Sequence, residues 1–409
     1  MMKSKIAIIL KNHWEEFLKL YGHRVRKNVK REVEKVLECG DLSKGYIEFK
    51  CHKCNESKKV AFTCKSRFCT SCGKIYVDNW IENMLGKLIN VRHRHIVFTI
   101  PEELREIFQR ERNLLKLLPQ CAAKTVLTWH KDQNKKESYT PGIVTVIHTF
   151  GRDLKWNPHV HMMVTEGGAG KENPWKHIRH FPYEMLRKRW QKLLLYALID
   201  ECKDKKKMKE LKNKLYSKHD NGFYVHARNE IKSAKVAAKY VGRYVGRPAI
   251  AESRILAYDG KFVTFKYTRH EDNKRIVEKV HVYEFIKKLI VHIPDKNFKM
   301  IRYFGLYTSR NKLKDNLIKM LDKRILDLKK SIRRWEYRIL ASFGVEPRKC
   351  PVCGESMIFY DIVYKNYGSI RGMLKDKFIN EASEKLEKAI EDYAMVKGII
   401  YGRIKPVAT

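Results

Sequence analysis

The spacing of apolar residues along the chain separates helical segments from strands. Between residues 14 and 38, the side chains of Trp14, Phe17 and Tyr21 fall on one face of a helix. Three short β-rich runs, each bounded by proline or glycine, predict strands at 95–100, 143–149 and 160–165. Basic stretches with helical character follow at 185–218 and 311–345. The pattern therefore predicts a fold that mixes helices with strands.

These elements fall into three regions, which we expect to be three domains. Residues 1–90 hold most of the cysteines and predict an N-terminal helical and zinc-binding domain. Residues 91–310 mix strands with helices. Residues 311–409 predict a basic helical region with a late pair of cysteines. A chain of 409 residues is also too long for one ordinary hydrophobic core.

The charge of the chain indicates its partner. The sequence has 86 Lys and Arg residues against 46 Asp and Glu residues, which gives a formal net charge of +40. Such a chain repels itself unless a polyanion offsets the charge, and nucleic acid is the polyanion that fits. The alternative is that its basic faces are merely solvated.

The hydrophobic runs are too short for a membrane protein. The longest early run, at 6–10, falls far short of the roughly 18 apolar residues of a membrane span. Charged residues follow it at once, which does not fit a secretory signal. We therefore expect a cytoplasmic protein without a membrane segment, in which cysteines stay reduced and serve metal binding.

Two Cys-x-x-Cys turns lie close together near the N-terminus. Cys51 and Cys54 form the first, and Cys69 and Cys72 form the second. Zn²⁺ takes four ligands in a tetrahedron, and two such turns supply four thiolates. The sequence therefore predicts one structural zinc ion bound by these four residues. Other residues in reach leave the ligand choice open: Cys39, His52 and Cys64.

A second and weaker zinc signal is the pair Cys350 and Cys353, which supplies only two thiols. It could recruit distant ligands or bind no metal. Basic residues surround the N-terminal cysteines, and Lys65 and Arg67 among them are candidate contacts for a phosphate backbone.

Histidines in one predicted strand form a candidate metal site. His159 and His161 alternate along the strand, so both imidazoles point to the same side. A turn at 151–158 would bring His148 beside them as a third ligand. A polar or core role for His148 is the competing interpretation, and the bare pattern is weak because His93-x-His95 repeats it.

A predicted helix carries two tyrosines four residues apart. Tyr240 and Tyr244 share one side of this helix, Arg243 and Arg247 run parallel to them, and Lys239 lies beside them. Phenols next to cations suit a phosphodiester, with the tyrosines as nucleophiles and the cations as DNA contacts. The alternative is a pair of tyrosines that brace a helix on a sheet.

Chemistry connects the histidines with the tyrosines. A phenol with a pKa near ~10 is a poor nucleophile at neutral pH. A divalent metal on the phosphate would neutralise charge and orient the phosphate for in-line attack. The product, a phosphotyrosine, keeps the energy of the ester, so the strand can be rejoined without ATP.

Four segments together resemble the two-tyrosine HUH transposases of rolling-circle insertion sequences. The histidines lie in HTFGRDLKWNPHVHMMVTEGG (148–168) and the tyrosines in KYVGRYVGRPAIAESRI (239–255). The block EFIKKLIVHIPDKNFKMIRYFGLYTSR (284–310) and the zinc module FTCKSRFCTSCGK (62–74) fit the same family. One departure is Asn157, which occupies a place where we expect a histidine.

The resemblance implies a fold and an activity. The fold class would be α+β, with a central antiparallel sheet flanked by helices, the HUH palm, in residues 91–310 as the catalytic domain. The protein would nick single-stranded DNA at an element end, form a 5′-phosphotyrosine, free a 3′-OH and transfer the strand to target DNA. Mg²⁺ or Mn²⁺ would serve catalysis and Zn²⁺ the structure.

Two other functions fit part of the same pattern. A rolling-circle replication initiator or relaxase would use the same chemistry on a plasmid origin. A non-catalytic zinc protein that binds nucleic acid would explain the charge and the cysteines, but would leave the histidines and tyrosines as accidents.

Overall fold

The computed structural model describes residues 4–308, apart from 86, 134–136, 179, 232, 247–248 and 270–271, together with 339–340, 344 and 346–377. The chain forms two compact units, each built from two separate segments. The large unit combines Met1–Glu32 with Arg67–Arg333, and the small unit combines Val33–Ser66 with Arg334–Thr409. This division differs from three consecutive domains with boundaries near 90 and 310, because strand pairing joins distant segments.

The large unit is organised around a five-stranded sheet in the order β12-β4-β5-β3-β8. Every neighbouring pair is antiparallel, which confirms the central antiparallel sheet that the resemblance implies. The strands are β3 (His93–Thr99), β4 (Gly142–Phe150), β5 (Trp156–Thr165), β8 (Val225–Ile231) and β12 (Ile301–Gly305). Three of them coincide with the predicted strands to within a few residues.

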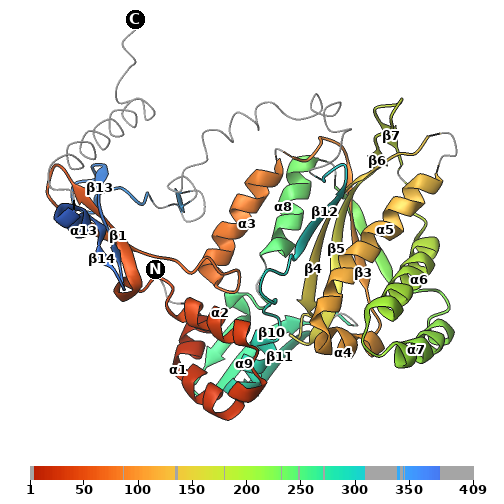
Figure 1. Cartoon of the computed structure of the whole chain (residues 1–409), viewed down its shortest axis with the longest axis horizontal. Coiled ribbons are helices and arrows are strands. Elements are labelled where there is room, and N and C mark those ends of the chain that lie inside the picture. The colour runs from red at the N-terminus through yellow and green to blue at the C-terminus, as the bar shows by residue number, and fades with distance from the viewer. Residues whose placement is uncertain are drawn as a thin grey trace, which may run out of the picture. The chain divides into compact units, whose positions relative to one another are not determined.

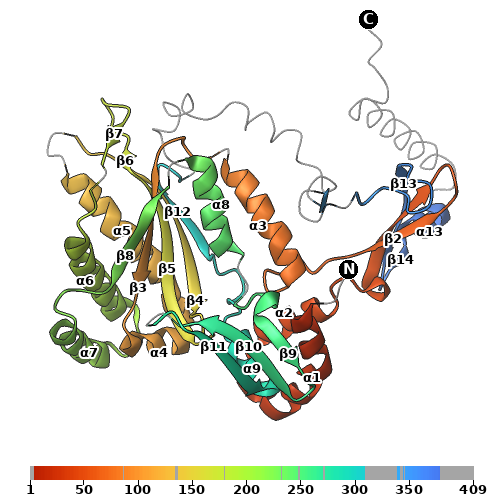
Figure 2. The same cartoon turned by 180° about the vertical axis from the view of Figure 1, so that it is seen from behind.

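Helices cover both faces of this sheet (Figure 1, Figure 2). One face packs against α4 (Glu102–Arg110), α5 (Leu117–Asp132) and α6 (Tyr183–Glu201), with α7 (Lys205–Lys218) beside α6. Alternate strand residues supply this core, because successive side chains of a strand point to opposite faces. Phe98, Val160 and Met162 are fully buried there with Trp129 and Trp190 of the helices.

The other face packs against α3 (Thr70–Leu85) and α8 (Ala234–Val245), which lie side by side in both views (Figure 1, Figure 2). Val144, Val146 and Met163 come from the sheet and are buried against Val241 and Trp80 of the two helices. Four residues that flank them in sequence belong to the opposite core: Ile143, Ile147, Met162 and Val164. The layers are therefore set by the two-residue period of β4 and β5.

A three-stranded sheet extends the large unit. Its strands are β9 (Ile255–Tyr258), β10 (Phe262–Thr268) and β11 (Arg275–His281), in the order β11-β10-β9. The helices α9 (Val282–Ile290) and α1 (Lys5–Tyr21) pack with it. The helix predicted at 14–38 is in fact two helices, because the chain leaves the α-helical path at Gly22–Arg24 before α2 (Lys27–Leu37) begins. Residues 4–32 thus belong to the large unit, where His13 hydrogen-bonds Tyr258.

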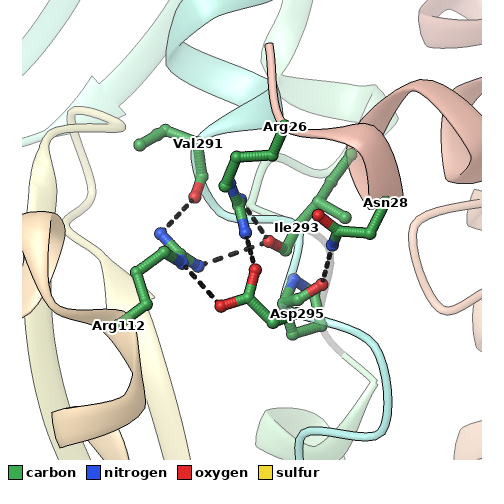
Figure 3. A network of polar contacts seen from close by, with 7 residues as sticks. Arg26, Asn28, Arg112, Val291, Ile293 and Asp295 are labelled. Carbon is green, nitrogen blue, oxygen red and sulfur yellow. Dashed lines mark hydrogen bonds and ion pairs between the residues drawn. The ribbon is translucent and has the colours of Figure 1, made fainter. Parts of the chain in front are cut away.

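A polar network anchors the N-terminal segment to this extension (Figure 3). The Asp295 carboxylate pairs with the guanidinium of Arg26 and lies 3.5 Å from that of Arg112. Both arginines also donate to the Ile293 carbonyl, and Asn28 donates to the Pro294 carbonyl at 2.8 Å. Burial, with Arg26 nearby, lowers the pKa of Arg112 to about 10. Asp295 therefore offsets two partly buried cations that would otherwise repel each other.

The small unit is built on a four-stranded antiparallel sheet in the order β14-β13-β1-β2. The strands are β1 (Gly45–Cys51), β2 (Ser57–Ala61), β13 (Met357–Tyr364) and β14 (Gly368–Ser369), followed by α13 (Ile370–Lys377). The β1–β13 ladder sets Cys51 opposite Met357. It therefore brings together the two segments of the chain that carry Cys-x-x-Cys turns near residues 51 and 350.

Shorter elements complete the described part of the chain: η1 (Gly22–Arg24), η2 (Leu42–Lys44), η3 (Arg112–Lys116), η4 (Glu252–Arg254), β6 (Gly167–Gly168) and β7 (Lys176–His177). The basic stretch at 185–218 is two helices, because Asp204 caps the start of α7 by accepting from the Lys207 amide. Most of the helix predicted at 311–345 lies outside the described residues. Within the part of the chain that the structure describes, we find no helix with the length and apolar character of a membrane span.

Candidate metal centre and tyrosine helix

Histidines from three adjacent strands point to the same face of the central sheet. His95 lies on β3, His148 on β4, and His159 and His161 on β5. His148 and His159 are direct partners across the β4–β5 ladder. All four alternate in sequence with residues of the opposite core, so the strand period aims them at the face that α8 covers.

Three of these side chains form a group that can hold a metal ion. One ligand nitrogen from each of His148, His159 and His161 lies within 4.8 Å of the others. The Nε2 atoms of His159 and His161 are 3.1 Å apart. The turn between β4 and β5 thus brings His148 beside the other two, as expected from the sequence.

The second ring nitrogen of each histidine already has a neighbour. His159 Nδ1 lies 2.7 Å from the Asn157 carbonyl, and His148 Nε2 lies 2.6 Å from the Tyr244 carbonyl. A carbonyl only accepts, so each of these nitrogens carries the proton. His161 Nδ1 lies 3.0 Å from His95 Nε2. Metal-binding histidines hold their second nitrogen in this way, so the three residues fit a divalent cation.

Asn157, where the resemblance led us to expect a histidine, contributes through its backbone. Its carbonyl oxygen fixes the ring of His159, a function that does not depend on the side chain. The departure from the family pattern therefore leaves the three-histidine group intact.

The helix α8 carries both tyrosines beside this group. Ser233 caps its start by accepting from the Val236 amide. The Tyr244 ring stacks on the His161 ring with centroids 3.9 Å apart, and its hydroxyl donates to the Tyr240 hydroxyl at 3.2 Å. The Tyr240 hydroxyl lies 3.2 Å from His95 Nδ1. Both phenols are partly buried next to the histidines, where a bound phosphate could meet them.

Two glycines let α8 approach α3. A Cβ on Gly242 would lie 2.5 Å from Ile81 side-chain atoms, and one on Gly246 would lie 2.2 Å from a Val77 methyl. The segment 240–247 repeats Tyr-Val-Gly-Arg, and a four-residue repeat puts each residue type on its own stripe of a helix. Tyrosine thus meets the histidines, valine the sheet and glycine α3.

His95 is the residue that the sequence did not single out. In the sequence, His93-x-His95 is only a second instance of the His-x-His pattern, and the structure gives its two histidines different surroundings. His93 is fully buried between the Val91 carbonyl and the Tyr307 hydroxyl, and burial lowers its pKa to about 4. His95 faces His161 and Tyr240 instead. Alternation along β3 was a visible signal, but the order of the strands was not.

The structure informs the predicted DNA contacts only in part. Lys239 is exposed on α8 in the large unit, and Lys65 is exposed in the small unit. The Arg67 guanidinium lies over the Tyr76 ring at 5.4 Å. Arg243 is on α8, but its side chain, like all of Arg247, lies outside the described part of the structure. These contacts therefore stay predictions.

The small unit gathers four cysteines, but not the four expected from spacing alone. Ligand atoms of Cys51, Cys54, Cys350 and Cys353 lie within 4.8 Å of one another. Cys51 Sγ is 3.4 Å from Cys353 Sγ, and Cys54 Sγ is 3.5 Å from Cys350 Sγ. A disulfide needs about 2.0 Å, whereas tetrahedral Zn²⁺ with bonds of about 2.3 Å separates sulfurs by about 3.8 Å. The arrangement fits a zinc ion.

The two Cys-x-x-Cys turns of this group share one backbone geometry. The Cys51 carbonyl accepts from the Asn55 amide and the Cys51 amide donates to the Glu56 carbonyl; Cys350 does the same with Gly354 and Glu355. Asn55 and Gly354 both have positive φ. Backbone amides, the largest contribution being that of Cys353, lower the pKa of Cys350 to about 7. A thiol with a lowered pKa gives the thiolate that zinc binds.

This set corrects the pairing of the first two turns. Cys69 and Cys72 are buried around the start of α3 in the large unit, apart from the group of Cys51. In the small unit, the Cys64 amide nitrogen lies 3.4 Å from Cys39 Sγ. The sequence favoured the nearest turn, whereas the β1–β13 ladder brings in a turn 302 positions away.

Known proteins match the chain over both of its parts. A family model described as "Transposase zinc-binding domain" matches residues 9–100, and one described as "Putative transposase" matches residues 142–314. The transposase for insertion sequence element IS801 of Pseudomonas savastanoi pv. phaseolicola is 28% identical over 359 residues, 83% of this chain and 86% of that protein. No solved structure matches the chain.

A second relative gives the same picture. Putative transposase y4qJ of Sinorhizobium fredii (strain NBRC 101917 / NGR234) is 27% identical over 286 residues, 65% of this chain and 71% of that protein. The zinc-binding match ends at residue 100, so β3 with His95 falls inside it although β3 pairs within the central sheet. The ordered motifs, both family matches and both relatives agree: the chain is similar to transposases of insertion sequences, with a zinc-binding match ahead of the transposase match.

Proposed function

We propose that this transposase cuts and rejoins single-stranded DNA at the ends of its insertion sequence. Tyr240 and Tyr244 are the nucleophiles, and His148, His159 and His161 hold a divalent metal. The observation that carries the proposal is the meeting of three imidazoles with two phenols on one face of the sheet. In this proposal, the central sheet with its two helical layers is an HUH palm.

The proposed reaction is an in-line displacement at phosphorus. The Oη atom of a tyrosine attacks the phosphate, and the bond from phosphorus to O3′ breaks as the bond to Oη forms. The phenol proton passes to solvent, and solvent protonates the leaving O3′. The products are a 5′-phosphotyrosine and a free 3′-OH, and attack by a 3′-OH on the phosphotyrosine rejoins a strand.

The histidines support this step by presenting lone pairs and no negative charge. A bound Mg²⁺ or Mn²⁺ would neutralise the non-bridging phosphate oxygens and orient the phosphate. His148 donates to the backbone carbonyl of Tyr244, so the same contact that fixes the ligand also fixes the helix of the nucleophiles. A change in the position of α8 therefore disturbs both parts of the site.

Two tyrosines suit transposition better than a single nick. The first tyrosine holds the 5′ end of the cut strand while the element is transferred, and a second transfer needs a second nucleophile in the same site. Tyr240 and Tyr244 lie one helical turn apart, with ring centroids 5.5 Å apart. Either phenol could thus reach a phosphate at one metal.

Each rival function leaves one observation unexplained. A replication initiator or relaxase shares the chemistry, but the family matches join a zinc-binding region to a transposase region. In a non-catalytic zinc protein, there would be no functional reason for three histidines to meet and for each to hold its second ring nitrogen against a neighbour. A nicking assay separates the catalytic from the non-catalytic function.

For the small unit we propose a structural zinc ion on Cys51, Cys54, Cys350 and Cys353. Its support is the pair of matching turns and the sulfur distances. Lys65 and Arg67 remain proposed contacts to the phosphate backbone, together with Lys239, Arg243 and Arg247. The reaction and the zinc fold would thus reside in different units of the chain.

The test uses an oligonucleotide that copies one end of the element, incubated with protein and Mn²⁺ and analysed on a denaturing gel. Wild-type protein should yield a covalent protein–DNA adduct. The double variant Tyr240→Phe/Tyr244→Phe should yield none, because the hydroxyls are lost while the rings keep their packing. An adduct at the wild-type rate in this double variant would overturn the proposal.

The matched variant for the metal is His159→Ala/His161→Ala. It should bind the oligonucleotide with nearly unchanged affinity in a gel-shift assay but fail to cut it. Transposition of a marked element is measured in parallel, and each single Tyr→Phe variant should lose it. If only one of them does, the protein works as a one-tyrosine initiator or relaxase.

A further inference from the structure

His95 lies between the histidine group and the tyrosines. It is on the central part of β3, and only 1% of its surface is exposed. Its ring is nearly parallel to that of His161 at 5.2 Å and to that of Tyr244 at 5.3 Å. Its segment falls in the zinc-binding match, so neither family region marks it as part of the reaction site.

Hydrogen-bonding contacts run through His95 from the metal site to one phenol. His161 Nδ1 lies 3.0 Å from His95 Nε2, and His95 Nδ1 lies 3.2 Å from the Tyr240 hydroxyl. The Tyr244 hydroxyl donates to the Tyr240 hydroxyl at 3.2 Å. The Tyr240 oxygen is therefore the end point of two contacts, one from a histidine and one from the second tyrosine.

Metal binding would set the direction of these hydrogen bonds. If His161 binds the cation through Nε2, its Nδ1 carries the proton and donates to His95 Nε2. Neutral His95 then carries its own proton on Nδ1 and donates to Tyr240. The Tyr240 oxygen accepts from His95 and from Tyr244, and as a phenolate it keeps a lone pair for phosphorus.

We propose that His95 is a positioning residue that makes Tyr240, and not Tyr244, the nucleophile of the first cleavage. The inference rests on the proposed function and deepens it. The Tyr240 Oη–P bond forms as the P–O3′ bond breaks, the phenol proton passes to solvent, solvent protonates the leaving O3′, and His95 keeps its proton on Nδ1. Tyr244 cannot take this role in the same arrangement, because its hydroxyl is the donor to Tyr240.

The site of the adduct reports the assignment directly. The oligonucleotide assay is stopped after the first cleavage, the protein is digested with trypsin, and the nucleotide-linked peptide is identified by mass spectrometry. Trypsin cuts after Lys239 and Arg243, so the two tyrosines fall on different peptides. Wild-type protein should carry the adduct on Tyr240 in at least about tenfold excess, the effect of one hydrogen bond to a charged oxygen.

Three substitutions at one position separate the two contacts of His95. His95→Phe keeps an aromatic ring without a donor and should bring the ratio of the two adducts close to one. In His95→Asn the amide nitrogen takes the place of Nδ1, so Tyr240 should keep its preference. In His95→Gln the amide nitrogen takes the place of Nε2, so the preference should be lost. A merely structural residue would not produce this ordering.

The outcomes distinguish the two proposals. An adduct on both tyrosines equally in wild-type protein, or an unchanged preference in His95→Gln and His95→Phe, overturns the role of His95 and leaves the proposed function standing. If wild-type protein forms an adduct on neither tyrosine, the proposed function fails and the role of His95 with it. Thermal melts check folding, and the Asn and Gln variants carry the test if His95→Phe does not fold.

Discussion

Histidines of the large unit lie in two opposite kinds of surroundings, which their neighbours set. In His148 and His159 one ring nitrogen donates to a backbone carbonyl, and the second is turned toward the other imidazoles. His93, His130 and His292 are instead buried in ways that keep them neutral. Burial lowers their pKa values to about 4, 3 and 4. Residue type alone thus does not mark a metal site.

His130 gives the sharpest test at this scale. It is fully buried between Trp129 and Phe181, and within the described residues neither ring nitrogen has a hydrogen-bond partner. His130→Phe should raise the free energy of unfolding by about 1–3 kcal/mol, because it removes two unsatisfied polar atoms without opening a cavity. Urea unfolding at pH 7 measures this, and a loss of stability would show that the ring is satisfied in solution.

The same residue links stability to pH. In the unfolded chain, His130 binds a proton below about pH 6.5. In the folded chain, burial lowers the pKa of His130 to about 3, so the ring stays neutral down to that pH. Because the unfolded state then binds more protons, stability is lost as the pH falls through this window. The melting temperature of wild-type protein should decrease from pH 7 to pH 5 more steeply than that of His130→Phe. Equal slopes would contradict the assignment.

Among the elements, α8 carries most of the requirements of the site. It must bring two phenols to the histidines, bury two valines on the sheet and lie close against α3. Its repeat of four residues satisfies all three because each requirement falls on one stripe. The glycines are the least replaceable part, since α3 occupies the space that a side chain would need.

Gly246→Ala tests this packing. The new Cβ would lie 2.2 Å from a Val77 methyl and 3.0 Å from the Gly73 carbonyl oxygen, so α8 must move away from α3. We expect a loss of about 1–3 kcal/mol in the free energy of unfolding and a decrease in adduct formation, because Tyr244 moves with the helix. Chemical unfolding and the oligonucleotide assay measure the two effects.

Gly22→Ala is the matched control. Gly22 has helical φ and ψ, and a Cβ there would meet its nearest atom at 3.6 Å, an ordinary contact. This variant should be neutral or slightly more stable and should cut DNA like wild type. If the two variants behave alike, the close approach of α3 and α8 does not limit the site.

At the scale of the whole molecule, each unit is closed by residues far apart in sequence. Asp295 pairs with Arg26 in the large unit, and Cys51 meets Cys353 in the small unit. The end of the described chain is thus as necessary to the zinc group as its beginning. A search for zinc ligands within any one stretch of sequence finds only half of the group.

Zinc content tests this closure. Cys350→Ser should remove one equivalent of Zn²⁺ from the purified full-length protein, although Cys51 and Cys54 remain. Cys202→Ser is the control, because Cys202 is a buried cysteine of the large unit outside this group, and its zinc content should equal that of wild type. Metal analysis of both variants decides the matter. Unchanged zinc in Cys350→Ser would exclude this ligand set.

The sequence by itself determined the features that depend on local spacing. Because strand residues alternate, His159 and His161 lie on the same side of a strand, and the short turn places His148 opposite His159. The four-residue interval places Tyr240 and Tyr244 on one side of a helix. These features follow from the periods of strands and helices, which any stretch of chain carries within itself. Charge and the order of the motifs added the DNA partner and the family.

Only the tertiary structure decided which distant segments meet. The order of strands in the central sheet put β3 beside β5, and this made His95 a neighbour of His161 while His93 became a core residue. The β1–β13 ladder selected Cys350 and Cys353 as partners of Cys51 and Cys54. Strand pairing depends on the burial of whole faces against helices, a property of the folded chain that no local spacing contains.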